Sequence, residues 1–289
     1  MKAPKFSYIR AANVEQALLL LDRHGSDARI LAGGQSLMPT LNMRLAQPAM
    51  LIDINRLDTL KGISITNGMV RIGALARHVE VMSAPIVREH LPLIAEAMPH
   101  VAHLAVRNRG TFGGSIALAD PAAEMPACAL ALQATIVVES VQGRRSIRAE
   151  DYFIGLYETA RQPNELVVEV LIPSQHADTV SVFMELSRRR GDFAMAGIAC
   201  CMRFERDVVL DARLVYFGSE GKPTLAHRAV AAIKGKPWSD THIEAACAGL
   251  GSDLAPMKSL EGEPAMLLHL QRVLTRRVLN AAFERAGAQ

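Results

Sequence analysis

The stretch that decides the fold is Ile30-Leu31-Ala32-Gly33-Gly34-Gln35-Ser36-Leu37-Met38-Pro39, an apolar run that ends in paired glycines. A strand that enters paired glycines and small polar residues can direct successive backbone N–H groups at one point, where they bind a phosphate or pyrophosphate. Neither G-x-x-x-x-G-K-[ST] nor G-x-G-x-x-G is present, which excludes the P-loop and the dinucleotide-binding fingerprint. Gly34-x-Ser36 begins like a nucleophile elbow, but Met38 stands where that motif needs glycine. The stretch therefore predicts either a phosphate cradle or a plain strand-to-turn connection.

A second glycine-rich loop lies further along the chain. It reads Arg109-Gly110-Thr111-Phe112-Gly113-Gly114-Ser115 and is followed by Asp120-Pro121-Ala122-Ala123-Glu124. Two such loops can hold one elongated dianion between them. Asp120 before Pro121 is typical of a helix N-cap with proline at the first helical position. Glu124 would then lie in the first helical turn, where the dipole favours a carboxylate that can also accept hydrogen bonds from ribose or polyol hydroxyls.

A third segment, Ser187-Arg188-Arg189-Arg190-Gly191-Asp192-Phe193-Ala194, combines a basic run with a glycine. It fits either a solvated turn between strands or a contact with a phosphate or an acidic partner surface. The histidines show no spacing that gathers a metal site, and we expect His100 and His103 on an exposed turn. The four cysteines lack a C-x-x-C pair, so we expect buried thiols and no zinc or iron–sulfur site at Cys128, Cys200, Cys201 and Cys247.

Composition excludes several classes of protein. The chain has 289 residues, of which 50% are apolar and 21% charged, and this composition is typical of a globular protein and not of a disordered one. The aromatic content of 4% argues against a stacking platform for single-stranded nucleic acid, and the net charge of +3 is too small to imply a polyanionic partner. The apolar run 126–138 is shorter than the roughly 18 residues of a membrane span, and the N-terminus lacks an apolar signal core. We therefore expect a cytoplasmic protein with no membrane span and no nucleic-acid partner.

Local signals predict a mixed arrangement of helices and strands. Asn13 with Gln16 forms a capping box for a helix over 14–24, which Gly25 ends. Up to the linker at 173–178, we predict strands over 29–32, 50–54, 70–73, 135–139 and 165–172, helices over 77–82, 86–97 and 122–132, and a loop over 33–48. After the linker, we predict a three-stranded meander over 180–187, 194–205 and 208–218, then helices over 225–234, 240–249 and 262–286. Strands followed by helices indicate an α+β architecture.

The three loops together resemble the FAD-binding medium subunit of the molybdenum hydroxylases, the family of xanthine dehydrogenase, carbon monoxide dehydrogenase and bacterial N-heterocycle dehydrogenases. The resemblance rests on residues 32–37, on 110–116 with Pro121 and Glu124, and on 187–189 with 192–194. It covers nearly the whole chain. It implies a vanillyl-alcohol-oxidase-type FAD-binding domain over 1–176, with α/β subdomains at about 1–56 and 57–176. A C-terminal domain over 177–289, with a three-stranded antiparallel sheet and helices, would follow.

The resemblance also implies roles for individual residues. The pyrophosphate would be held by the backbone of Ala32, Gly33, Gly34, Gln35, Ser36 and Leu37, while Thr111, Gly114 and Ser115 approach the pyrophosphate and ribityl chain. Glu124 stands where the family usually has an Asp that bonds flavin hydroxyls, and the loop that ends in Asp192 and Phe193 approaches the isoalloxazine ring. Ser115 replaces a frequent Asn or Asp, and Met184 lies where Lys is common. These departures and the longer Glu124 are expected to alter individual contacts and the flavin potential.

The function that the resemblance implies is an electron outlet in a multisubunit complex. A large molybdopterin subunit would oxidise the substrate, a small subunit with two [2Fe-2S] clusters would relay electrons, and the FAD of this chain would pass them to an external acceptor, in a dimer of heterotrimers. No catalytic residue and no metal ligand is assigned to this chain. Two other functions remain open, a stand-alone FAD-dependent reductase or oxidase and a non-catalytic nucleotide-binding or assembly module.

Overall fold

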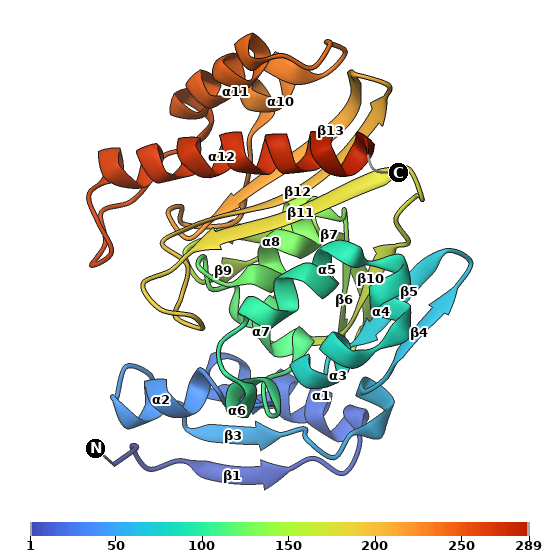
Figure 1. Cartoon of the computed structure of the whole chain (residues 1–289). Helices are drawn as coiled ribbons and strands as arrows, with labels where there is room; N and C mark the ends of the chain where they lie inside the picture. The colour runs from blue at the N-terminus through green and yellow to red at the C-terminus, as the bar shows by residue number, and fades with distance from the viewer. Residues whose placement is uncertain (1, 288–289) are drawn as a thin grey trace.

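The computed structural model describes residues 2–287 and contains four β-sheets with helices packed between and around them (Figure 1). The N-terminal sheet is parallel, in the order β1 (Ser7–Arg10), β3 (Met50–Asp53) and β2 (Ala28–Leu31). Helix α1 (Val14–His24) lies between β1 and β2 in the chain. The prediction of an uninterrupted loop over 33–48 is wrong, because the short helix α2 (Leu37–Asn42) follows the paired glycines.

Helix α1 begins and ends where the sequence predicts. The Asn13 side chain accepts a hydrogen bond from the Gln16 N–H at 2.8 Å, and the Gln16 side chain accepts one from the Ala12 N–H at 2.7 Å. Gly25 terminates the helix at a φ of 48°, a value that favours glycine. The apolar face buries Ala17, Leu18 and Leu21, and this packing fixes the helix against the N-terminal sheet.

The middle part of the chain forms a five-stranded antiparallel sheet. Its order is β4 (Ile63–Thr66), β5 (Met69–Gly73), β10 (Leu166–Pro173), β6 (Thr135–Ser140) and β7 (Gly143–Arg148). The sequence predicts its three inner strands and misses β4 and β7 at the two edges. Both edge strands are mostly exposed; β4 alternates isoleucine with Ser64 and Thr66 over only four residues, and β7 is polar apart from the buried Ile147, so neither gives a strong strand signal.

Within the described residues, seven α-helices lie between β5 and β10 along the chain. They are α3 (His78–Ser83), α4 (Pro85–His90), α5 (Pro92–Ala97), α6 (Leu104–Arg107), α7 (Phe112–Leu118), α8 (Glu124–Ala131) and α9 (Ala149–Tyr152), with a small hairpin of β8 (Phe153–Gly155) and β9 (Glu158–Thr159). Of these helices, α4, α7 and α9 contact strands of this sheet. The predicted single helix over 86–97 is two helices, because Pro92 lacks an N–H and Leu91 before it is not helical.

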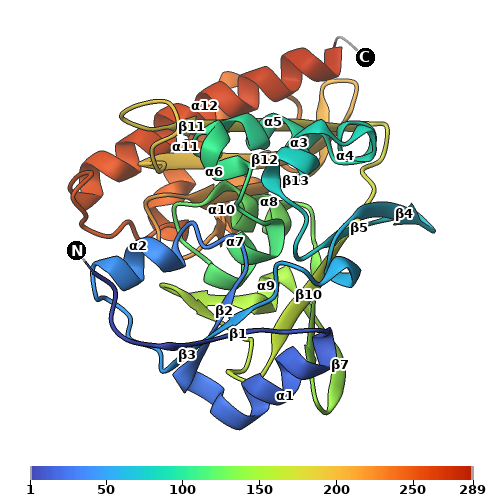
Figure 2. The same ribbon diagram turned by 90° about the horizontal axis from the view of Figure 1, so that it is seen from below.

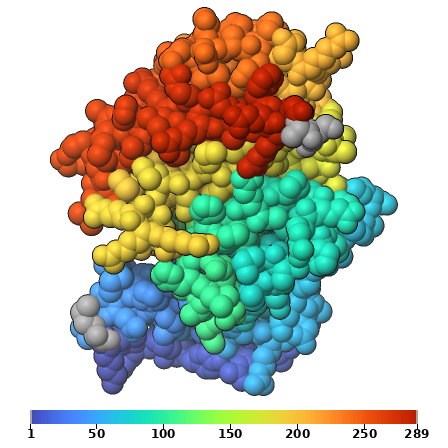
Figure 3. Space-filling view, in the orientation of Figure 1, coloured from blue at the N-terminus to red at the C-terminus, as the bar shows by residue number. Residues whose placement is uncertain are grey.

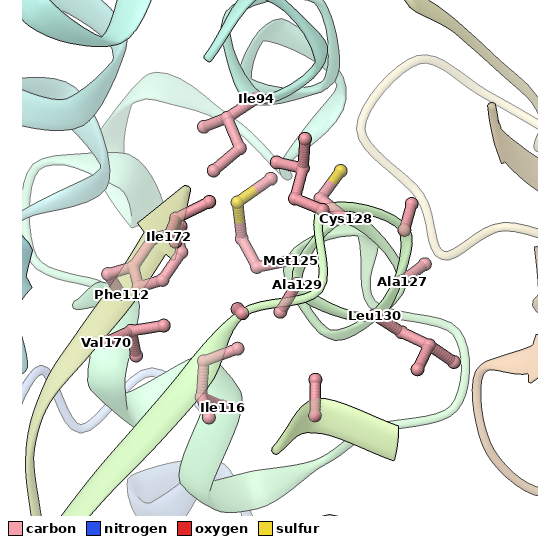
Figure 4. Packing of buried hydrophobic residues seen from close by; sticks show 14 of the residues in the cluster. Ile94, Phe112, Ile116, Met125, Ala127, Cys128, Ala129, Leu130, Val170 and Ile172 are labelled. Carbon is pink, nitrogen blue, oxygen red and sulfur yellow. The ribbon is translucent and has the colours of Figure 1, made fainter. Parts of the chain in front are cut away.

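Helix α8 begins two residues later than the sequence predicts. The residue at its N-cap is Ala123, so the prediction that Asp120 caps this helix is wrong. Asp120 instead accepts a hydrogen bond from the Ala122 N–H at 3.0 Å, which closes a turn before the helix starts. All eight residues of α8 are buried, and Figure 4 shows Met125 beside Phe112 of α7 and Ile94 of α5. This helix is therefore a central element of the core.

The C-terminal sheet has four antiparallel strands, where the sequence predicts three. They are β11 (Thr179–Leu186), β12 (Ala196–Glu205), β13 (Val208–Phe217) and β14 (Thr224–Leu225). The two-residue strand β14 was missed because so short a segment has no periodicity to read. The turn at Arg206 joins β12 to β13 as predicted.

This sheet is covered on both faces. The helices α10 (His227–Ile233), α11 (Asp240–Asp253) and α12 (Pro264–Gly287) cover one face, and α5 and α8 pack against the other (Figures 1 and 2). Strand β12 accordingly buries Ala199 and Cys201 in the core around α8 and Ile198 and Cys200 in the core beneath α12. All four cysteines are buried free thiols, as predicted. Within residues 2–287, no helix combines the length and apolar character needed to cross a membrane.

Candidate functional site

The first glycine loop leaves β2 and enters α2 through a tight turn. Gly34 has a φ of +72°, in the left-handed region that favours glycine. The Gln35 side-chain amide donates to the Gly33 carbonyl at 2.9 Å and orders the turn. The backbone N–H groups of Gly33, Gly34 and Gln35 donate to no acceptor among residues 2–287. Consecutive unpaired N–H groups can bind an anion, so this loop can act as the predicted cradle.

The two glycine loops lie in direct backbone contact. A Cβ on Gly33 would collide with the carbonyl oxygen of Arg109 and would stand 2.9 Å from the Cα of Gly110. Glycine at position 33 is thus what lets the two loops approach. The structure brings together two segments that are far apart in the sequence.

The second loop forms a short antiparallel β-bridge, Arg77 with Thr111, to the segment after β5. Its backbone exchanges hydrogen bonds with that segment, from the His78 N–H to the Gly110 carbonyl at 3.0 Å and from the Phe112 N–H to the Ala76 carbonyl at 2.9 Å. The Thr111 side chain caps α7 by accepting from the Gly114 N–H at 3.1 Å. These contacts fix the loop that contributes Thr111, Gly114 and the half-buried Ser115 to the predicted site.

A series of hydrogen bonds connects the two loops. Arg77 donates to the carbonyl of Arg109 and, at 2.7 Å, to the side-chain oxygen of Asn55. The Asn55 amide donates in turn to the Ala32 carbonyl at 2.7 Å and to Asp53 at 2.8 Å. No sequence motif marks Asn55 or Arg77 as part of a site. The available signal was their position, since each follows closely after a strand.

Asp53 is a buried acid at the end of this series of hydrogen bonds. Burial alone would raise its pKa, but hydrogen bonds from the Tyr8 hydroxyl and from the backbone and side chain of Asn55 outweigh burial and leave the pKa of Asp53 lowered. The carboxylate is therefore ionised at neutral pH and accepts these hydrogen bonds in the folded protein.

A cavity of about 480 Å³ opens beside the contact between the loops. A volume of this size suits part of a dinucleotide-sized ligand. Of the predicted contacts, Ala32, Gly33, Gly34 and Gln35 line the cavity. The other lining residues are Leu31, Met38, Pro39, Asn42, Asp53, Asn55 and Arg109, a mixture of apolar and polar groups.

The arginine-rich loop between β11 and β12 is anchored at two points. A Cβ on Gly191, where φ is +87°, would stand 2.9 Å from the His103 ring, so the loop lies close against the segment before α6. Figure 3 shows this yellow loop beside the green middle part of the chain. On the other side, Arg188 pairs with Glu261 at 2.7 Å. The loop leaves Phe193 64% exposed, which makes its ring available to a planar ligand.

Glu124 lies outside the cavity lining and is only 7% exposed. Burial, together with the neighbouring Glu185 carboxylate, raises the pKa of Glu124 to about 8. Glu185 accepts from His100, whose Nδ1 is 3.2 Å from its Oε1. The prediction that His100 and His103 both lie on an exposed turn is wrong for His100, which is half-buried and paired with a carboxylate.

Comparisons with known families divide the chain into two matched regions. Residues 4–175 match the family described as "FAD binding domain in molybdopterin dehydrogenase". Residues 181–282 match "CO dehydrogenase flavoprotein C-terminal domain". The two matches together span most of the chain.

Named relatives are similar over their full length. The carbon monoxide dehydrogenase medium chain of Hydrogenophaga pseudoflava is 37% identical over 99% of this chain and 100% of its own. A subunit of the 6-hydroxypseudooxynicotine dehydrogenase complex of Paenarthrobacter nicotinovorans is 37% identical over 99% and 97%. Among solved structures, carbon monoxide dehydrogenase from H. pseudoflava matches with a TM-score of 0.96 at 38% identity, covering 99% of each chain. Quinoline 2-oxidoreductase from Pseudomonas putida 86 matches with a TM-score of 0.94 at 35% identity, also covering 99% of each chain.

Proposed function

Because the chain belongs to the family of FAD-binding medium subunits of molybdenum hydroxylases, we propose that it is the electron-outlet subunit of such a complex. Electrons would pass from the [2Fe-2S] clusters of a small partner subunit to the FAD of this chain and then to an external acceptor. The observation that carries the proposal is the contact of two glycine loops beside a cavity that is lined in part by Gly33, Gly34 and Gln35, whose backbone N–H groups are unpaired within residues 2–287. The chain is thus part of an oxidoreductase.

The proposed FAD site combines the three loops in a domain of the vanillyl-alcohol-oxidase type. The first loop would bind the pyrophosphate through its N–H groups, and the second would approach it from the side of α7. Bound FAD would supply the electron chemistry, while the chain binds, orients and tunes it. The proposed contacts are Ala32, Gly33, Gly34, Gln35, Ser36, Leu37, Thr111, Gly114, Ser115, Glu124, Asp192 and Phe193.

The proposed partners are a small iron–sulfur subunit and a large molybdopterin subunit, assembled as a dimer of heterotrimers. Relatives at 37% identity carry the names of a medium chain and of a complex subunit, which supports an assembly of several chains. Substrate oxidation would occur on the large subunit. The cytoplasmic location expected from the sequence stays a prediction.

The proposal is tested by asking which preparation allows substrate to reduce the flavin. The co-expressed complex and the isolated FAD-loaded chain are mixed anaerobically with the substrate of the complex, and flavin absorbance near 450 nm is followed. We expect bleaching only in the complete complex. Bleaching of the isolated chain would favour a stand-alone reductase or oxidase, and nucleotide binding without flavin chemistry would favour an assembly module.

A further inference from the structure

Three titratable side chains from distant parts of the sequence lie close enough to influence one another, and two of them are buried. His100 ends the short helix at Met98–His100, Glu124 begins α8, and Glu185 lies near the end of β11. The His100 Nδ1 is 3.2 Å from the Oε1 of Glu185, and the imidazole packs on the Phe183 ring with the centroids 5.2 Å apart. We call these three side chains the His100 cluster.

The carboxyl groups of the cluster are almost fully removed from solvent. The Glu185 side chain is 3% exposed, and its second oxygen, Oε2, has no hydrogen-bond partner among residues 2–287. Glu124 is 7% exposed. An unpaired buried carboxylate oxygen is costly, and a positive charge on the neighbouring imidazole reduces that cost. The unpartnered Oε2 thus leaves a buried acceptor whose charge favours a cation on His100.

The surrounding charges favour a bound proton. The hydrogen bond to Glu185 raises the pKa of His100, and burial is the largest cause of the raised pKa of Glu124. Asp120 adds a further negative charge near Glu124, whereas Arg190 opposes a positive charge on His100. The nearby Cys128 thiol stays neutral, because burial raises its pKa. Glu124 therefore keeps its proton at neutral pH, and the Glu185 carboxylate favours a proton on His100.

The residues of the cluster adjoin, along the chain, segments that we propose to contact FAD. The second glycine loop runs into α7, and Glu124 follows that helix in the chain. Glu185 is the second-last residue of β11, just before the arginine-rich loop. His103, three residues after His100, is the residue that Gly191 of that loop lies against. The His100 side chain is still 39% exposed, so protons can enter the cluster from water at its outer edge.

We propose that the His100 cluster is a proton-uptake site that binds one solvent proton when the adjoining cofactor site becomes more negative. This inference rests on the proposed function. The proton binds at Nε2 of His100, and the imidazolium that forms pairs through Nδ1 with Oε1 of Glu185. The charge of the His100–Glu185 pair rises from −1 to 0. No electron is transferred within the cluster. Negative charge nearby stabilises the protonated imidazole through Coulomb attraction.

The main test measures the midpoint potential of the FAD-loaded chain as a function of pH. One linked proton changes the two-electron equilibrium constant tenfold per pH unit, which corresponds to about 30 mV. We expect a slope steeper by that amount in the wild type than in Glu185→Gln and His100→Gln. Glu244→Gln is the matched control, because Glu244 forms an exposed ion pair with Arg276 in the C-terminal part. Equal slopes in all four proteins would overturn the proposal.

A second measurement needs no FAD and separates the two proposals. NMR titration of the His100 ring in the FAD-free chain should show a lower pKa in Glu185→Gln than in the wild type, and Glu185→Asp should restore part of the shift. If the His100 titration is the same in all three proteins, the cluster is not coupled and the inference fails. A chain that shows the coupling but binds no FAD would instead refute the proposed function.

Discussion

Replacing Gly33 by alanine should separate the two glycine loops. The new Cβ would collide with the Arg109 carbonyl oxygen and would stand 2.9 Å from the Gly110 Cα and 3.0 Å from the Arg109 carbonyl carbon. Because ordinary carbon contacts begin near 3.5 Å, the loops would have to move apart by at least about 0.6 Å. Overpacking of this kind costs about 1–3 kcal/mol of stability, since backbone atoms have no alternative rotamer to adopt.

The same displacement should weaken FAD binding. A shift approaching 1 Å in a positioning group can reduce binding or rate by about 100-fold, so we expect the FAD dissociation constant of Gly33→Ala to rise by about 10- to 100-fold. Urea denaturation measures the stability, and quenching of flavin fluorescence measures the affinity. Gly221→Ala is the control, because its Cβ would meet its nearest neighbour, the Met257 sulfur, at an ordinary 3.5 Å. If Gly33→Ala matched that control in both assays, the two-loop site would be refuted.

Three further changes test the contacts around the site. Thr111→Val removes the cap on the Gly114 N–H and should cost about 1 kcal/mol in urea denaturation, whereas Thr111→Ser should keep most of it; equal losses would rule out the cap. Asn55→Ala leaves the Ala32 carbonyl and Arg77 without their partner and should cost about 1–3 kcal/mol with weaker FAD binding, in contrast to Asn164→Ala at an exposed contact. Glu124 has its pKa raised from 4.5 to about 8, so the folded state holds this proton more tightly than the unfolded state. Its contribution to stability is complete below pH 4.5 and is lost as pH rises to about 8, so the wild type should lose stability relative to Glu124→Gln across that window; parallel pH profiles would contradict this reasoning.

Features with a local physical cause were predicted well. The helix at α1 follows from its capping residues and terminal glycine, and the strands β5, β6 and β10 follow from buried apolar runs. The glycine-rich loops could be recognised because a close backbone approach requires glycine, as Gly33 demonstrates. The family followed from the order of these loops along the chain.

Features that depend on distant contacts were missed. The edge strands β4 and β7 are fixed by pairing with the inner strands β5 and β6, because β4 is only four residues long and β7 is mostly polar. The pairing of His100 with Glu185 joins residues that are 85 positions apart, a contact that only the packing of β11 beside α5 creates. Asn55 and Arg77 likewise acquire their role when two loops meet. The sequence shows that Asn55 and Arg77 each follow a strand, but it contains no local signal for the residues that they contact.

The central claim is that this chain holds FAD between its two glycine loops. The most direct measurement is the visible absorption spectrum of the purified chain, followed by acid release and identification of the flavin. The account predicts close to one FAD per chain, either as purified or after incubation with added FAD. A colourless protein that fails to bind added FAD would contradict it.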